Sequence, residues 1–75
     1  MNGKITDAQL DEWFTYHAPT PEQAARYQMI RQGARAFATV LVECTPGGPD
    51  QTAALRKLRE SVMTANAAIA CEKKS

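Results

Sequence analysis

Two long stretches of helical apolar periodicity, separated by one strong break, constrain this chain most. In the break, residues 45–50, two prolines and two glycines fall within six positions. Proline and glycine interrupt helices, and a short loop between two helices makes them antiparallel neighbours. The sequence therefore predicts an all-α fold dominated by a long antiparallel helical hairpin.

The stretch before the break is predicted to be a helix over residues 20–44. Thr20 and Gln23 have the spacing of a capping box, and the fixed φ of Pro21 suits the first helical position. An apolar seam follows at Tyr27, Ile30, Ala34, Phe37, Leu41 and Cys44. A second strip of small and apolar residues runs beside it, at Met29, Gly33, Ala36 and Val40. We expect this helix to be covered from two sides, and Gly33, costly within a helix, to mark close approach of another backbone or a ligand.

Two further helices are predicted around this one. After the break, residues 50–71 carry a seam at Leu55, Leu58, Val62, Ala65 and Ile69. Near the start, Thr6 and Gln9 form another capping box for a short helix over residues 6–15, which ends before Pro19. We expect this short helix to fold back on the hairpin as a flap, within a single domain over residues 1–75.

The length of the chain argues for self-association. A chain of 75 residues buries only about 60% of the surface that it exposes when unfolded, so it needs staples or copies of itself. Cys44 and Cys71 end different helices and lie too far apart to bridge in a hairpin, and no Cys/His cluster has zinc spacing. We therefore expect a homo-oligomer without metal or cofactor.

Charge and hydropathy exclude two classes of partner. Lys plus Arg number 9 and Asp plus Glu 8, too little positive charge for the broad basic surface that DNA demands. No apolar run is long enough for a signal peptide or a membrane span. Since free thiols suit a reducing compartment, we expect a cytoplasmic protein that binds neither DNA nor a membrane.

Positive charge is instead concentrated near aromatic residues. Tyr27, Arg31 and Arg35 lie on successive helical turns, where a ring and two guanidiniums could hold a base and its phosphates. Tyr16 and His17 precede them in a linker between helices, where functional residues often lie. The pattern indicates a pocket for a flat anionic molecule.

Structural roles compete with these binding roles. Tyr27 begins the main seam, which favours a place in the core, and Arg31 could pair with Glu12 or Glu60. For Tyr16 and His17 the alternative is capping or packing. No nucleophile, carboxylate pair or metal cluster accompanies His17, so we expect no enzyme.

Arg59 and Asn66 are polar residues beside the apolar seam of the last helix. They are seven residues apart, so they project in nearly the same direction. Asn66 could be a buried polar residue that sets the register, with Arg59 extending from the edge of the seam. Alternatively both could contact a ligand, and in an oligomer the two roles can coexist.

Several separated motifs resemble those of a known family. They are residues 14–17 (FTYH) with Pro19, Tyr27 with Ile30 and Arg31, the proline break at residue 46, and residues 60–70 (ESVMTANAAIA). Over roughly residues 12–71 the chain resembles the phage anti-CBASS cyclic-oligonucleotide sponges, whose helical hairpin domain is shared with a type of anti-Thoeris sponge.

The resemblance implies a small phage-encoded hexamer, a trimer of dimers, acting in the cytoplasm of the infected host. Such proteins sequester cyclic nucleotide immune signals without cleaving them, with cyclic dinucleotides at dimer interfaces and cyclic trinucleotides, in some members, near threefold axes. By the same resemblance Tyr16 would stack on a base and Arg31 would meet a phosphate. The pocket rim would come from His17, Pro19 and Arg35, and a second, trinucleotide site from Arg59 and Asn66.

A different class of function also fits the sequence. An exposed apolar strip on a helical hairpin could dock a helix of a host protein. A helix-turn-helix that binds DNA fits less well, because the last helix has Ala where base-reading side chains should be. The alternative to a nucleotide sponge is thus a homo-oligomeric interaction module.

Overall fold

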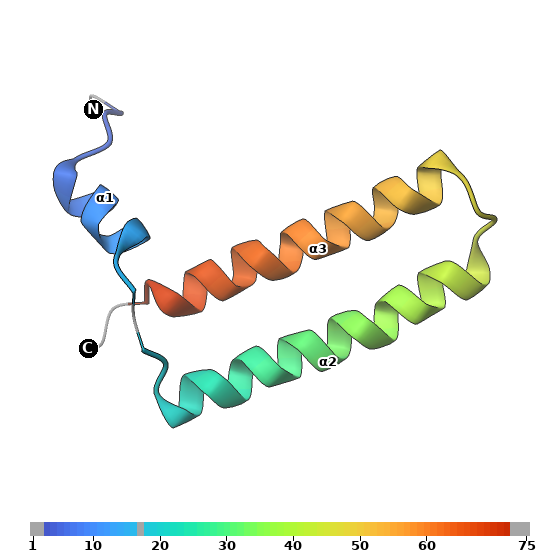
Figure 1. Ribbon diagram of the computed structural model, residues 1–75, viewed down its shortest axis with the longest axis horizontal. Coiled ribbons are helices and arrows are strands. Elements are labelled where there is room, and N and C mark those ends of the chain that lie inside the picture. Colours follow the sequence, from blue (N-terminus) through green and yellow to red (C-terminus); the bar gives the residue numbers. More distant parts are fainter. Residues whose placement is uncertain (1–2, 17, 73–75) are drawn as a thin grey trace.

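Three helices make up the structure, a computed structural model that describes residues 3–16 and 18–72. Helix α1 spans Asp7–Phe14, α2 spans Pro21–Cys44 and α3 spans Pro49–Ala70. Figure 1 shows α2 and α3 side by side and antiparallel, joined by a loop at one end. No strand occurs in this described part of the chain. The predicted all-α hairpin is confirmed, and each helix begins and ends within one residue of its predicted limits.

Reciprocal hydrogen bonds start α1 and α2. At α2, the backbone N–H of Gln23 donates to Thr20 Oγ1 at 3.1 Å, and the backbone N–H of Thr20 donates to Gln23 Oε1 at 3.0 Å. At α1, the backbone N–H of Gln9 donates to Thr6 Oγ1 at 3.2 Å, and the backbone N–H of Thr6 donates to Gln9 Oε1 at 2.9 Å. Both capping boxes satisfy amide groups that would otherwise lack partners. The two predicted helix starts are confirmed.

The loop end of the hairpin is closed by a glycine and a glutamine. Gly48 precedes α3 with φ 153° and ψ −173°, a conformation that residues with a Cβ rarely adopt. Gln51 Nε2, in the first turn of α3, donates to the carbonyl oxygens of Val42 at 3.3 Å and Thr45 at 3.1 Å. One side chain thus ties the last turn of α2 to the first turn of α3.

The opposite end of the hairpin is held by a polar cluster that we term the Gln23 junction: Gln23, Arg26, Ile69 and Glu72. Gln23 Nε2 donates to the Ile69 carbonyl and to Glu72 Oε1, both at 3.1 Å. Arg26 forms ion pairs with Glu72 and, at 3.3 Å, with Glu22. The bond to Glu72 raises the pKa of Arg26 above its ordinary value. The junction fixes the start of α2 against the end of α3.

The hairpin buries little apolar surface. Among the described residues, Ile69 is the one buried hydrophobic side chain, with Gln23 buried beside it. The radius of gyration is 16.1 Å, whereas a compact domain of this length has about 11 Å. The strip predicted to be covered from a second side is open, with Met29 72% and Val40 48% exposed. Helix α3 covers one side of α2, and no other described part of the chain covers the opposite side.

Helix α1 stands away from the hairpin (Figure 1) and packs against neither α2 nor α3. The prediction that α1 folds back on the hairpin as a flap is therefore wrong. The chain leaves α1 in extended geometry at Thr15, with φ −93° and ψ 135°, and the nearby hairpin end is the polar Gln23 junction. A contact at 3.9 Å from Cys71 Sγ to the Glu12 carbonyl places α1 beside that end.

We predict that Gly48→Ala destabilises the hairpin by about 1–3 kcal/mol, because alanine is strained at this φ. Gly47→Ala is the matched control, since Gly47 has no positive φ and an added Cβ would meet nothing within 4 Å. Its effect should stay within about 0.5 kcal/mol. Urea unfolding followed by circular dichroism at one protein concentration measures both. Equal effects of the two variants would contradict the assigned role of Gly48.

We predict that replacing the two capping-box glutamines has unequal effects on the stability of the hairpin. Gln23→Ala removes the buried bond to the Ile69 carbonyl and should cost about 1–3 kcal/mol in the same unfolding measurement. Gln9→Ala breaks the equivalent box on α1, which packs on neither long helix, so the main transition should move much less. A larger loss from Gln9→Ala would show that α1 supports the hairpin.

Candidate functional site

The residues proposed for ligand binding lie in three regions of the chain: the linker between α1 and α2, α2 itself, and α3. Tyr16, in the linker between α1 and α2, is 84% exposed, and Pro19 is exposed nearby. His17 lies outside the described residues. Arg31 comes ten residues after the first residue of α2, about 15 Å along the helix axis. Tyr16, Pro19 and Arg31 are thus all exposed on a single chain.

A hollow in the hairpin brings two predicted residues together from different helices. It measures about 280 Å³ and has Arg35 of α2 and Arg59 of α3 in its lining. The remaining lining is apolar, consisting of Ala34, Ala38, Leu55, Leu58, Val62 and Met63. The sequence had suggested separate sites for the two arginines, whereas here they share one depression. Whether the two arginines line one hollow depends on the register of α2 against α3. The periodicity along each helix gives no information about that register.

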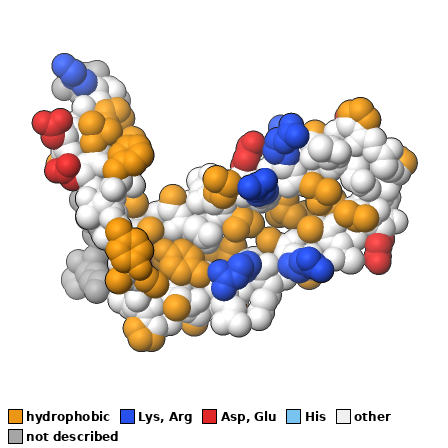
Figure 2. All heavy atoms as spheres, in the orientation of Figure 1, with side chains coloured by type: hydrophobic (Ala, Val, Ile, Leu, Met, Phe, Trp, Pro, Cys, Tyr) orange, Lys and Arg blue, Asp and Glu red, His pale blue; other side chains and the backbone are white. Residues whose placement is uncertain are grey.

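We call this side of the hairpin the basic face; it includes Arg31, one turn before Arg35. Figure 2 shows Lys and Arg side chains from both long helices gathered around hydrophobic ones on this face. Arg31, Arg35 and Arg59 are all exposed. None of the three has an ion-pair partner among residues 3–16 and 18–72. The pairing of Arg31 with Glu12 or Glu60 is therefore absent there, and these cations remain available to an external anion.

Arg26 has a different role from the other arginines of α2. Its guanidinium is engaged by Glu22 and Glu72 in the Gln23 junction, so it stabilises the hairpin end. In the sequence, Arg26 lies in the same short segment as Arg31 and Arg35. Arg26 differs from Arg31 and Arg35 in its contact with Glu72, which follows Arg26 by forty-six residues in the sequence.

The opposite side of the hairpin, the apolar face, has a hollow of about 310 Å³ without a charged residue in its lining. Its lining residues are Met29, Ile30, Gly33, Ala34, Phe37, Leu58, Ser61, Val62 and Ala65. A Cβ added at Gly33 would meet nothing within 4 Å. The close neighbour expected at Gly33 is not part of this chain's described structure. Gly33 and Arg35 are two positions apart in the sequence, which is about 200° around α2. The two faces therefore point in opposite directions.

Tyr27 and Asn66 lie closer to the interior. Both are half-buried, and Asn66 Oδ1 is buried without a hydrogen-bond partner within the described chain. An amide oxygen in this state costs free energy unless a donor reaches it. The half-burial agrees with the expected places of Tyr27 on the seam and of Asn66 beside it.

Other kinds of site have no counterpart in the described residues. No group of three or more His, Cys, Asp or Glu side chains there is placed to hold a metal ion. Among the same residues, no helix combines the length and hydropathy needed to cross a membrane. Cys44 is exposed and Cys71 half-buried, and both are free thiols.

The basic face has the chemistry to hold a flat anion. Its apolar floor can accept the face of a base, while guanidiniums at the edge can donate two parallel hydrogen bonds to a phosphate. Met63 and Leu55, which the sequence did not predict to be part of a binding site, contribute to that floor. The hollow is open to solvent on one chain, so tight retention requires a further surface to cover it.

The comparisons with known proteins identify the family. The family model described as Acb2/Tad1, hairpin domain, matches residues 6–70, a range that includes all three helices. Neither a curated protein nor a solved structure gives a significant match. The resemblance to the anti-CBASS sponges, whose hairpin is shared with an anti-Thoeris type, is confirmed by this match. The chain belongs to the Acb2/Tad1 hairpin domain family, whose members act as sponges in phage anti-defence.

Proposed function

We propose that this protein binds and sequesters cyclic dinucleotide immune signals, and also cyclic trinucleotides, without cleaving them. It acts in the cytoplasm of the infected host and blocks CBASS-type signalling. The observation that carries the proposal is membership of the sponge family over residues 6–70. Exposed arginines that form no ion pair with any described residue lie beside an apolar hollow and supply the matching chemistry.

The assembly that we propose is a homo-oligomer, a hexamer built as a trimer of dimers. The chain exposes 6400 Å², whereas a compact monomer of its length exposes about 4500 Å². The excess of about 1900 Å² corresponds to roughly two standard interfaces at about 800 Å² per partner. The apolar face, with Phe37 52% exposed, is suited to such contacts.

The ligand site that we propose lies between protomers. A cyclic dinucleotide offers two base faces and two phosphates, which a twofold interface matches with one aromatic ring and one cation from each subunit. Tyr16 stacks on a base, and Arg31 donates to a phosphate. The rim comes from His17, Pro19 and Arg35, and Tyr27 lies one turn before Arg31 on the same helix. Because the ligand is enclosed by two chains, its release requires an opening motion, which lowers the dissociation rate.

A second site for cyclic trinucleotides is proposed at Arg59 and Asn66. Arg59 is exposed and has no ion pair among the described residues. Asn66 Oδ1 has no donor among the described residues, and in this proposal the Asn66 amide turns toward a ligand or a neighbouring copy. A charged phosphate and a base-edge donor are the complementary groups.

The alternative is a helical interaction module that binds a host protein. The exposure of Met29 at 72% and of Phe37 at 52% favours it, because exposed apolar patches often mark protein contacts. This alternative predicts a protein partner and indifference to nucleotides, whereas the sponge predicts direct nucleotide binding.

We predict that calorimetry on the intact protein detects binding of at least one cyclic di- or trinucleotide. The corresponding linear dinucleotide, whose ends are not held together, is the control and should bind more weakly, since it loses conformational freedom on ordering. Chromatography of the recovered ligand should return it unchanged. No binding across the panel would exclude the sponge, and a cleaved ligand would make the protein an enzyme.

We predict that Arg31→Ala weakens cyclic dinucleotide binding roughly 10- to 150-fold, because it removes a hydrogen bond between charged groups worth about 1.5–3 kcal/mol. Tyr16→Ala should lose stacking worth about 1–3 kcal/mol. Lys57→Ala is the matched control, since Lys57 is exposed and lines neither hollow. All three variants should keep the wild-type elution volume. Normal affinity in either of the first two would place the site elsewhere.

A further inference from the structure

The linker between α1 and α2 approaches the end of α3 from both of its sides. On the α1 side, Cys71 Sγ contacts the Glu12 carbonyl at 3.9 Å, and Cys71 directly follows α3. On the α2 side, the linker ends at Thr20, the N-cap of α2, whose backbone N–H donates to Gln23 Oε1 at 3.0 Å. The end of α3 is therefore the part of the hairpin against which the linker is placed.

The side-chain amide of Gln23 makes the connection on the α2 side. Its oxygen accepts from the Thr20 backbone N–H, and its nitrogen donates to the Ile69 carbonyl and to Glu72 Oε1, both at 3.1 Å. Gln23 is buried, where a donor or acceptor without a partner is costly, so these partners favour a single orientation of the amide. One planar group thus joins the last residue of the linker to the end of α3.

Two of the proposed ligand contacts lie on the part of the chain that Gln23 anchors. Tyr16 precedes Thr20 by four residues and Pro19 precedes it by one. Four residues span at most about 14 Å, and the ring of Pro19 restricts both its own φ and the residue before it. Tyr16 is 84% exposed, so its place depends mainly on the backbone that carries it.

We propose that Gln23 is a positioning residue for the cyclic dinucleotide site and that it acts through Tyr16. This inference rests on the proposed function, in which Tyr16 stacks on a base. By anchoring Thr20 to the end of α3, Gln23 orders the linker before the ligand arrives, so that less conformational freedom is lost when Tyr16 stacks. Gln23 is itself buried and acts without touching the ligand.

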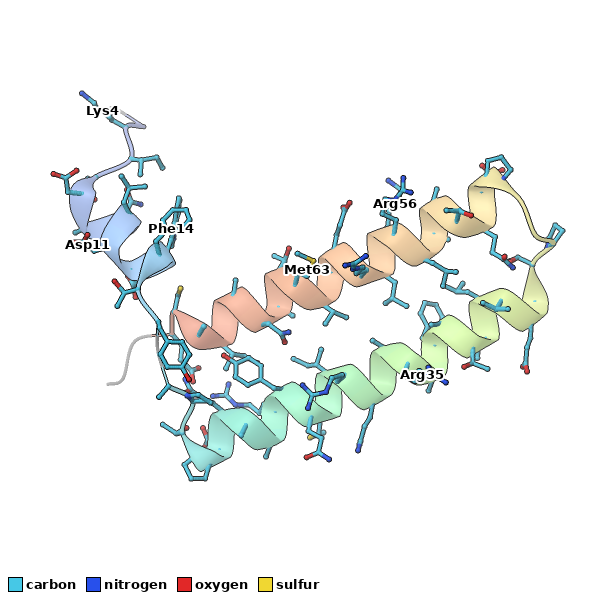
Figure 3. The ribbon with its side chains drawn as sticks, in the orientation of Figure 1. Lys4, Asp11, Phe14, Arg35, Arg56 and Met63 are labelled. Atoms are coloured by element: carbon cyan, nitrogen blue, oxygen red, sulfur yellow. The ribbon has the colours of Figure 1, made fainter. Side chains whose placement is uncertain are left out.

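A second glutamine supplies a matched control at the other end of the hairpin. Gln51 also joins α2 to α3, through its bonds to the carbonyl oxygens of Val42 and Thr45. Figure 3 shows Phe14, the last residue of α1, near the linker end of the hairpin, whereas Arg56, five residues after Gln51, lies toward the loop. Gln51→Met therefore removes the same kind of bond without affecting the linker.

The test measures affinity by calorimetry for the cyclic dinucleotide that the wild-type protein binds most tightly. Gln23→Met keeps the size of the side chain but loses its donor and acceptor, and should weaken binding about 3- to 10-fold. Gln51→Met should change the affinity by less than about twofold. In Tyr16→Ala protein, Gln23→Met should have less than about a twofold effect, because the ring that it positions is absent. In Arg31→Ala protein the full effect should remain, since Arg31 lies on α2 itself and independent effects add.

A milder pair of variants preserves the capping box and gives the answer even where Gln23→Met does not fold. In Gln23→Glu the carboxylate still accepts from the Thr20 backbone N–H, but it cannot donate to the Ile69 carbonyl and it faces Glu72. Adding Glu72→Gln supplies an amide donor to the new carboxylate. We expect Gln23→Glu to weaken binding and the added Glu72→Gln to recover part of the lost affinity. In Tyr16→Ala protein neither step should change the affinity.

Circular dichroism and elution volume identify the variants that are folded and assembled as the wild-type protein is. Three results would overturn the inference: equal losses of affinity from Gln23→Met and Gln51→Met, which indicate a general loss of stability; an undiminished effect of the Gln23 variants in Tyr16→Ala protein; and wild-type affinity in both Gln23 variants. A wild-type protein that binds no cyclic dinucleotide would overturn the dinucleotide site and this inference together, whereas binding without coupling to Tyr16 overturns this inference alone.

Discussion

The hairpin is only two helices thick, and the rest of the structure depends on this constraint. Two antiparallel helices share one line of contact, so each seam residue is covered on one side, and Ile69 is the one described hydrophobic side chain that becomes buried. Polar and backbone contacts must therefore define the ends: the Gln23 junction at one, Gly48 and Gln51 at the other. A chain built in this way has a well-defined protomer shape and much apolar surface that remains to be covered by other molecules.

That surface is divided chemically between two sides. The apolar face combines Gly33 with Met29 and Phe37, and its hollow has no charge in its lining. The basic face presents Arg35 and Arg59 around a hollow of similar size. The first composition is typical of contacts between protein surfaces and the second of contacts with anions. A sponge needs both, because a ligand enclosed between chains is retained only as long as the chains stay together.

The helices were predictable because their determinants are local. Thr20, Gln23 and Pro21 fix a helix start within four residues, and the prolines and glycines of residues 45–50 fix the break. The place of α1, the meeting of Arg35 with Arg59, and the capture of Arg26 by Glu72 were missed. Each depends on how segments distant in sequence are set against one another, and periodicity along one helix has no information about that.

The loop beyond α2 lies at the end of the hairpin remote from the linker and from the Gln23 junction (Figure 1). Doubling the length of a closed loop adds only about 0.6 kcal/mol of closure entropy. Extra residues inserted between Thr45 and Gly48 would protrude beyond the helix ends and leave the side faces of the hairpin unchanged. Insertions and deletions are therefore most readily accommodated at this tip, where the chain can lengthen or shorten without altering either side face.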